Sequence, residues 1–251
     1  MRFRAAMLLA AVAVGCHDRA TTRTAEAGAP AMDDRCGVPG DDDKATRAVL
    51  LRCIGVAPSP LDPIRRAELG DGALLEARVA SDASRGTDMA PPDLLVVWVD
   101  GTPPGVRAWG RSNAREGILA AARLATLGGE RVIVERAGTS WGANDPWSGA
   151  VEIVWLVRGT DLVRAGRYVV QTGGGFGSLG SKEPSSTYVA TSSFVARQIF
   201  VDEQLTWHYP GLAETRRSSF RRTYTLTGDV LVADSTAAET PPPFPSVTND
   251  R

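Results

Sequence analysis

Hydrophobic and polar positions follow two different periods in the first half of the chain. Residues 41–53 begin with three aspartates and then place Val49 and Leu50 on one side, which predicts a short helix. Residues 73–80 alternate as a strand does. Residues 94–100 (LLVVWVD) form the strongest strand pattern of the chain, between Pro92 and Gly101.

The most regular helical pattern covers residues 112–127. Ser112 or Asn113 can cap its start, its apolar residues share one face, and Gly128 with Gly129 ends it. Residues 131–136 (RVIVER) then have the composition of a strand. The pattern therefore predicts a strand–helix–strand unit over residues 94–136.

Beyond residue 140 the pattern is mainly that of strands. Residues 151–157 and 162–171 flank a turn at residues 158–161, and further strands are expected at 188–200 and 204–209. Residues 220–234 predict a hairpin with Gly228 and Asp229 at its tip. We therefore predict a strand-rich α+β fold in which the unit at 94–136 precedes mainly antiparallel β hairpins.

One segment, residues 148–165, fits a helix as well as a strand. If it is helical, residues 94–172 resemble the periplasmic domain of ExbD/TolR-type biopolymer-transport proteins. The resemblance lies in VVWVDG, a helix, RVIVER, a second helix and AGRYVVQT. It covers under a third of the chain, and that family also carries a transmembrane anchor.

The first residues have the pattern of an export signal. Arg2 and Arg4 precede an apolar run over residues 5–15, which is shorter than the roughly 20 residues of a membrane-spanning helix. The run ends in small residues before Cys16 and resembles the bacterial lipobox, although Ala13 stands where that motif prefers leucine. The resemblance implies removal of residues 1–15 and a lipid on Cys16. The alternative is an ordinary secreted protein in which Cys16 is incidental.

The remaining composition divides the chain into segments. Residues 16–35 are rich in Ala, Thr and charge, which predicts a flexible linker behind the lipidated cysteine. Residues 36–234 form the expected globular domain, with a sub-boundary near residue 140, and residues 235–251 form a proline-rich, disordered tail. His17 follows Cys16 where an aspartate would retain a lipoprotein at the inner membrane. A cell-envelope location, with the outer membrane favoured, is therefore expected.

The other two cysteines form a natural pair. An exported chain meets an oxidising compartment, so we expect a disulfide between Cys36 and Cys53, which would stabilise the fold by about 3 kcal/mol in the chain-entropy model. The chain contains only two histidines, His17 and His208, and the cysteine spacing fits no zinc pattern. We therefore predict neither a metal nor a cofactor.

Charge adds little to this interpretation. Cleavage after residue 15 would remove Arg2 and Arg4 and no acid, which leaves 26 basic and 29 acidic residues, a net charge of −3. This balance does not favour nucleic acid as a partner. The expected partners are a membrane, through the lipid, and an envelope protein or a glycan, while the oligomeric state stays open.

Two glycine-rich motifs are candidates for chemistry. Residues 138–142 match G-x-S-x-G, so Ser140 is a candidate nucleophile with His208 as base and Asp161 or Asp202 as the third member of a triad. That motif needs a helix after the serine, and the sequence ANDPWSG argues against one. Gly175 and Gly177 begin a G-x-G-x-x-G pattern, but loop residues follow it instead of the helix that a dinucleotide site requires. Each motif has the alternative of an ordinary turn or loop.

Two classes of function therefore stay open. The first is a lipid-anchored, non-enzymatic binding or structural module, with Trp141, Trp147, Gly175 and Gly177 as candidate ligand-binding residues. The second is an envelope serine hydrolase that uses Ser140 and His208. A calycin-like barrel that binds a ligand is a third interpretation of the C-terminal strands, and it predicts an apolar interior cavity.

Overall fold

A computed structural model describes residues 39, 42–70, 72–80, 93–101, 104–113, 117–140, 148–175, 185–208 and 215–234. These residues form one helix and twelve strands. The elements are α1 (Asp43–Ile54), β1 (Arg65–Glu68), β2 (Gly72–Arg78), β3 (Asp93–Gly101), β4 (Pro104–Asn113), β5 (Ile118–Leu127), β6 (Glu130–Ser140), β7 (Ser148–Arg158), β8 (Asp161–Gly175), β9 (Ser185–Val195), β10 (Gln198–His208), β11 (Thr215–Thr227) and β12 (Val230–Ala233). The prediction of a strand-rich fold is confirmed.

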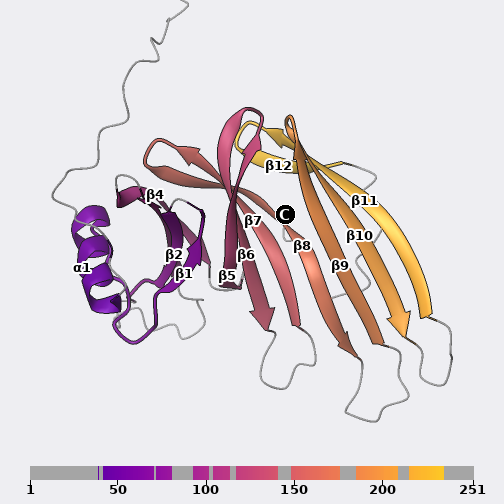
Figure 1. Ribbon diagram of the computed structural model, residues 1–251, viewed down its shortest axis with the longest axis horizontal. Coiled ribbons are helices and arrows are strands. Elements are labelled where there is room, and N and C mark those ends of the chain that lie inside the picture. The colour runs from indigo at the N-terminus through magenta and orange to yellow at the C-terminus, as the bar shows by residue number, and fades with distance from the viewer. Residues whose placement is uncertain are drawn as a thin grey trace, which may run out of the picture. The chain divides into compact units, whose positions relative to one another are not determined.

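All twelve strands belong to one sheet that branches at β8. The main path runs β1-β2-β3-β4-β8-β9-β10-β11-β12, and β5, β6 and β7 form a second branch that joins β8 through β7 (Figure 1). Neighbouring strands are antiparallel, except that β4 meets β8 in parallel where Trp109 is paired with Asp161. The long strand β8 therefore connects the hairpins of the C-terminal half to the strands of the N-terminal half.

The first core lies between β1–β4 and β5–β8. Residues that alternate along these strands bring their side chains together, and Trp155, Ile133, Ile153 and Leu74 are fully or almost fully buried. The strands β1 and β5 lie next to each other beside this core. The backbone N–H of Leu119 on β5 donates there to the carboxylate of Glu76 on β2 at 3.1 Å. Large side chains thus occupy this core.

Helix α1 covers the opposite face of β2, β3 and β4. Val49 and Leu50 pack there against the buried residues Ala73, Leu75, Leu95 and Val97. Asp42 caps the helix by accepting hydrogen bonds from the backbone N–H groups of Lys44 and Ala45. The prediction of a helix over residues 41–53 is confirmed.

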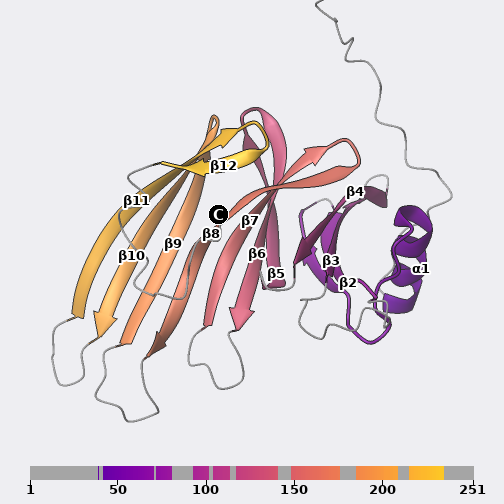
Figure 2. The same cartoon turned by 180° about the vertical axis from the view of Figure 1, so that it is seen from behind.

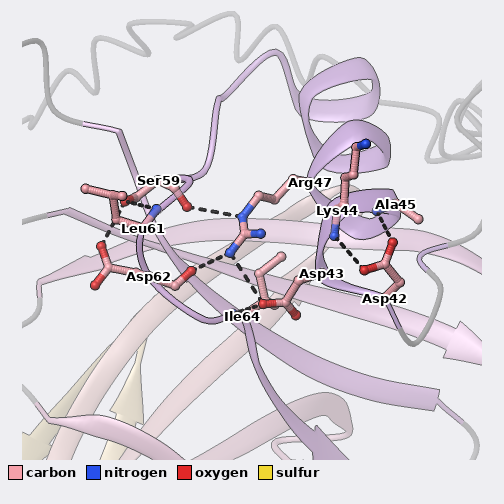
Figure 3. A network of polar contacts seen from close by, with 9 residues as sticks. All are labelled: Asp42, Asp43, Lys44, Ala45, Arg47, Ser59, Leu61, Asp62 and Ile64. Atoms are coloured by element: carbon pink, nitrogen blue, oxygen red, sulfur yellow. Dashed lines mark hydrogen bonds and ion pairs between the residues drawn. The ribbon is translucent and has the colours of Figure 1, made fainter.

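Arg47 of helix α1 forms hydrogen bonds with the loop between α1 and β1 (Figure 3). The Arg47 guanidinium donates to the backbone oxygen of Ser59 at 3.1 Å and to that of Asp62 at 2.5 Å. Asp43 accepts a hydrogen bond from the backbone N–H of Ile64, directly before β1. The helix and the first strand are therefore joined by side-chain contacts as well as by apolar packing.

A second core lies on the other face of β6, β7 and β8 and extends to β10 and β11. Its buried members include Val134, Val154, Leu156, Ile199 and Val201. The tips of the hairpins meet at one end of these strands, where Arg158 forms ion pairs with Glu130 and Asp229. Both views show the long strands β6 to β11 side by side (Figures 1 and 2).

The predicted helix at residues 112–127 is wrong. Its first residues end β4 and residues 118–127 form β5, which pairs with β6 from Ile118 opposite Gly138 to Leu127 opposite Glu130. Gly128 and Gly129 both have positive φ, 65° and 83°, as a two-residue hairpin turn of type I′ requires. The glycine pair joins two strands, and a β-bulge after Leu119 interrupts the regular alternation of β5.

Residues 148–158 form β7 and residues 161–165 begin β8, with a turn between them, so this segment is not helical. The ExbD/TolR resemblance required helices both here and at residues 112–127, so the fold that it implied is not present. The expected strand at 188–200 is interrupted by a turn at Ala196 and Arg197, where Ala196 has a φ of 51°. The hairpin turns at residues 158–161 and at Gly228 and Asp229 are confirmed.

Candidate functional site

Four glutamates are buried in the strands, which makes them the first candidates for chemistry. Glu76, Glu135 and Glu203 are each 2 % exposed and Glu152 is 8 % exposed. A buried carboxylate is costly unless charged or hydrogen-bonding groups compensate for its lost hydration. The partners of each carboxylate therefore decide whether it is available to a ligand.

The Glu152 cluster joins strands β5, β7, β8 and β9. The carboxylate of Glu152 accepts hydrogen bonds from Arg123 at 2.8 Å, from the hydroxyl of Tyr168 at 2.6 Å and from that of Ser192 at 2.7 Å. Arg123 also contacts Ser192 and stacks over the ring of Phe194. Burial and the nearby Glu152 carboxylate raise the pKa of Tyr168, so its hydroxyl stays protonated and donates.

The Glu203 cluster lies further along the same face, on β9, β10 and β11. Glu203 forms an ion pair with Arg222 at 2.5 Å, and both side chains are nearly buried. Burial raises the pKa of Glu203, while Arg222 and the hydroxyl of Tyr188 oppose that rise. The rings of Tyr168 and Tyr224 lie 5.5 Å apart and connect the two clusters.

The other two glutamates lie on the opposite face, in the first core. Glu135 accepts a hydrogen bond from the indole N–H of Trp155 at 2.7 Å. Glu76 accepts hydrogen bonds from Arg65 and from the backbone N–H of Leu119, and burial raises its pKa. All four carboxylates are thus engaged with groups of the chain itself, an arrangement suited to joining strands rather than to acid–base catalysis.

The predicted triad residues are not brought together. Ser140 ends β6 and His208 ends β10, and three strands, β7, β8 and β9, lie between them. Neighbouring strands are about 4.8 Å apart, so the two residues are not neighbours. Asp202 lies six residues before His208 on β10, and its exposed carboxylate is held by Arg221 at 2.6 Å and 3.1 Å. Both carboxylate oxygens of Asp202 thus accept from Arg221, which also lowers the pKa of this acid.

The other candidate residues have different outcomes. Gly175 ends β8, while Cys16, Cys36, Trp141, Trp147 and Gly177 lie outside the described residues. Cys53 lies in the last turn of α1, half-buried against the adjoining core. The disulfide between Cys36 and Cys53 therefore stays a prediction. Within the described ranges, no group of three or more His, Cys, Asp or Glu side chains is placed to hold a metal ion.

A shallow pocket of about 210 Å³ lies on the exposed face of β9, β10 and β11. Its lining is formed by Val189, Thr191, Asp202, Glu203, Gln204, Ser219 and Phe220. Pockets for drug-sized ligands occupy roughly 300–1,000 Å³. This one can hold only a small group, such as a single side chain.

The sequence contains a signal for two of the buried glutamates that lies outside the glycine-rich motifs. Glu135 and Glu152 each stand in a run of β-branched and apolar residues, in RVIVERA and AVEIVWL. A glutamate inside such a run on a strand buried on both faces must be compensated by other residues. The residues that compensate Glu152 have no comparable signal in their own sequence neighbourhoods, because they come from other strands. They are Arg123, Tyr168 and Ser192.

Comparison with known proteins adds no assignment. No family model, no curated protein and no solved structure matches the chain. Among the described elements, no helix has both the length and the apolar character needed to cross a bilayer.

Proposed function

We propose that this protein is a lipid-anchored protein of the cell envelope, attached through Cys16, whose folded part is a non-enzymatic binding or structural module. The non-enzymatic character of the folded part is inferred from one observation: three strands separate Ser140 from His208. The engagement of all four buried glutamates by other side or main chains supports the same conclusion. Nothing among the described residues favours the hydrolase.

The proposed anchor predicts a defined covalent change at the N-terminus. The intact mass of the membrane-extracted protein should show loss of residues 1–15 and a diacylglyceryl group on Cys16. A Cys16→Ser variant cannot carry the thioether-linked lipid, so it should move from the membrane fraction to the soluble fraction. Cys53→Ser, which leaves the signal intact, is the matched control and should stay with the membrane. A Cys16→Ser protein that sediments with membranes as the unaltered protein does would refute the anchor.

The absence of serine-hydrolase chemistry is tested separately. A fluorophosphonate probe labels a serine that a neighbouring histidine activates. We expect the full chain to show no more labelling than the Ser140→Ala variant, as read by in-gel fluorescence and mass spectrometry. Labelling of Ser140 that disappears in a His208→Ala variant would establish the hydrolase in place of the binding module.

A further inference from the structure

The outer edge of β11 is open over most of its length in the part of the chain that the structure describes. On one side β11 pairs with β10, from Thr215 opposite His208 to Thr225 opposite Gln198. On the other side β12 pairs only with residues 224–227. Both views draw the rest of β11 at the margin of the sheet (Figures 1 and 2). Residues 215–222 thus offer about 27 Å of strand edge, at roughly 3.4 Å per residue.

The main-chain groups that face this edge can be identified. Adjacent residues of a strand direct their N–H and C=O groups to opposite sides. The backbone N–H of Asp234, directly after β12, donates to the oxygen of Thr223 at 2.8 Å, so the odd-numbered residues of β11 face the β12 side. The pairing of β10 with β11 runs without a bulge. Arg217, Ser219 and Arg221 therefore direct their N–H and C=O groups to the open edge.

The same stretch is strongly basic. Its sequence, TRRSSFRR, contains four arginines and no acid. Arg217 is exposed on the same face as Arg221, which pairs with Asp202 and is itself 63 % exposed. Open strand edges bind other strands unless charge or shape prevents it, so the sign of this charge selects the partner.

A second copy of this chain is a poor partner for this edge. Antiparallel pairing of two β11 strands centred on Ser219 would set Arg217 of one copy opposite Arg221 of the other. Like charges placed directly opposite one another destabilise a strand pair. An acidic strand would instead place its carboxylates beside these arginines.

We propose that the open edge of β11 binds an extended, acidic peptide segment of another envelope protein, which joins the sheet as an added strand. Main-chain hydrogen bonds to Arg217, Ser219 and Arg221 supply affinity, as in other cases of strand addition. Arg217 and Arg221 lie four residues apart on one face, so two acids four residues apart in the peptide lie opposite them. This inference rests on the proposed function as a binding module and names the class of partner.

The proposal is tested with two blocked heptapeptides, VEVSVEV and VKVSVKV, and the detergent-extracted full chain. Fluorescence anisotropy should show the acidic peptide binding about tenfold more tightly than the basic one, because two cross-strand attractions replace two repulsions. The difference should shrink as salt is raised from about 0.05 M to about 0.5 M, since the arginines are exposed.

Ser219→Pro is the decisive variant. Proline removes the N–H that faces the open edge while the ladder to β10 keeps its donors, so the acidic peptide should lose at least tenfold in affinity. Ser219→Thr keeps the N–H and is the matched control, which should bind as the unaltered chain does. If Ser219→Pro does not fold, the Arg217→Glu/Arg221→Glu variant takes its place and should prefer the basic peptide.

Several outcomes would overturn the proposal. These are equal binding of the two peptides, undiminished binding to a folded Ser219→Pro variant, and an unchanged preference after the double charge reversal. A concentration-dependent dimer in light scattering that Ser219→Pro abolishes would identify a second copy as the occupant and would also overturn it. Each of these results leaves the tests of Cys16 and Ser140 unaffected, so failure here is distinguishable from failure of the proposed function.

Discussion

Replacing Trp155 by alanine is expected to lower the free energy of unfolding by about 3–5 kcal/mol. Trp155 is 0 % exposed and packs in the first core with residues from β2, β3 and β6. Truncation opens a cavity there. It also removes the indole N–H, which donates a hydrogen bond of 2.7 Å to the carboxylate of Glu135. Total stabilities of folded domains are typically about 5–15 kcal/mol, so this one change removes a large fraction. Urea denaturation followed by circular dichroism measures it.

Two further variants separate the causes of that loss. Trp155→Phe keeps most of the volume and removes the hydrogen bond to Glu135, so it should cost about 1–3 kcal/mol. Leu61→Ala changes a side chain that is 92 % exposed and should stay within about 0.5 kcal/mol of the unaltered protein. A Trp155→Ala protein as stable as Leu61→Ala would contradict the packing described for this core.

Removal of the Arg222 guanidinium is the second large effect. Arg222→Ala should lower the free energy of unfolding by about 3–5 kcal/mol at neutral pH, because it leaves the carboxylate of Glu203 buried without its cation. Both side chains of the pair are nearly buried, at 11 % and 2 % exposure, so solvent screening does little to reduce the cost. Urea denaturation at fixed ionic strength measures this loss.

The loss in Arg222→Ala should depend on pH with a definite sign. Burial already raises the pKa of Glu203 in the folded chain, and Arg222 opposes that rise. Without Arg222 the pKa rises further, so the folded variant holds a proton that the unfolded chain releases as pH increases. Unfolding is then favoured as pH rises from the unfolded pKa of about 4.3 through the folded value. The deficit relative to the unaltered protein should therefore be smaller at pH 5 than at pH 8.

A double variant provides the control for this pair. Glu203→Leu combined with Arg222→Met replaces both charges by apolar side chains of similar size, and should recover most of the stability lost in Arg222→Ala. Recovery without pH dependence would assign the deficit to the buried carboxylate. A double variant as unstable as Arg222→Ala would show that packing, and not charge, accounts for the loss.

The parts of the fold that the sequence predicted correctly depend on local chemistry. Gly159 and Gly228 both adopt positive φ, at 61° and 60°, in the tight turns that were expected at those positions. The helix α1 follows the run of aspartates from which its start was predicted, with Asp42 as its cap, and the C-cap Gly55 has a φ of 73°. In each case neighbouring residues alone determine the backbone conformation.

Residues 118–127 show where local chemistry was insufficient. The segment is rich in alanine and leucine, which favour a helix, and its glycine pair is compatible with a helix end as well as with a hairpin turn. The segment nevertheless forms a strand, because it pairs along its length with β6, which is rich in β-branched residues. Tertiary context can override a helix propensity of a few tenths of a kcal/mol per residue, because each paired strand residue also gains packing on the sheet.

The amino-acid sequence by itself determined the strand-rich class, the position of α1 and two of the hairpin turns. Only the tertiary structure decided which residues meet: it set Ser140 and His208 at the ends of strands with three others between them, and joined Glu152 to Arg123, Tyr168 and Ser192. It also left the basic edge of β11 without a paired strand among the described residues. The physical reason is that turns and caps are satisfied by residues a few positions apart, whereas strand order and the partners of a buried charge depend on how distant segments pack.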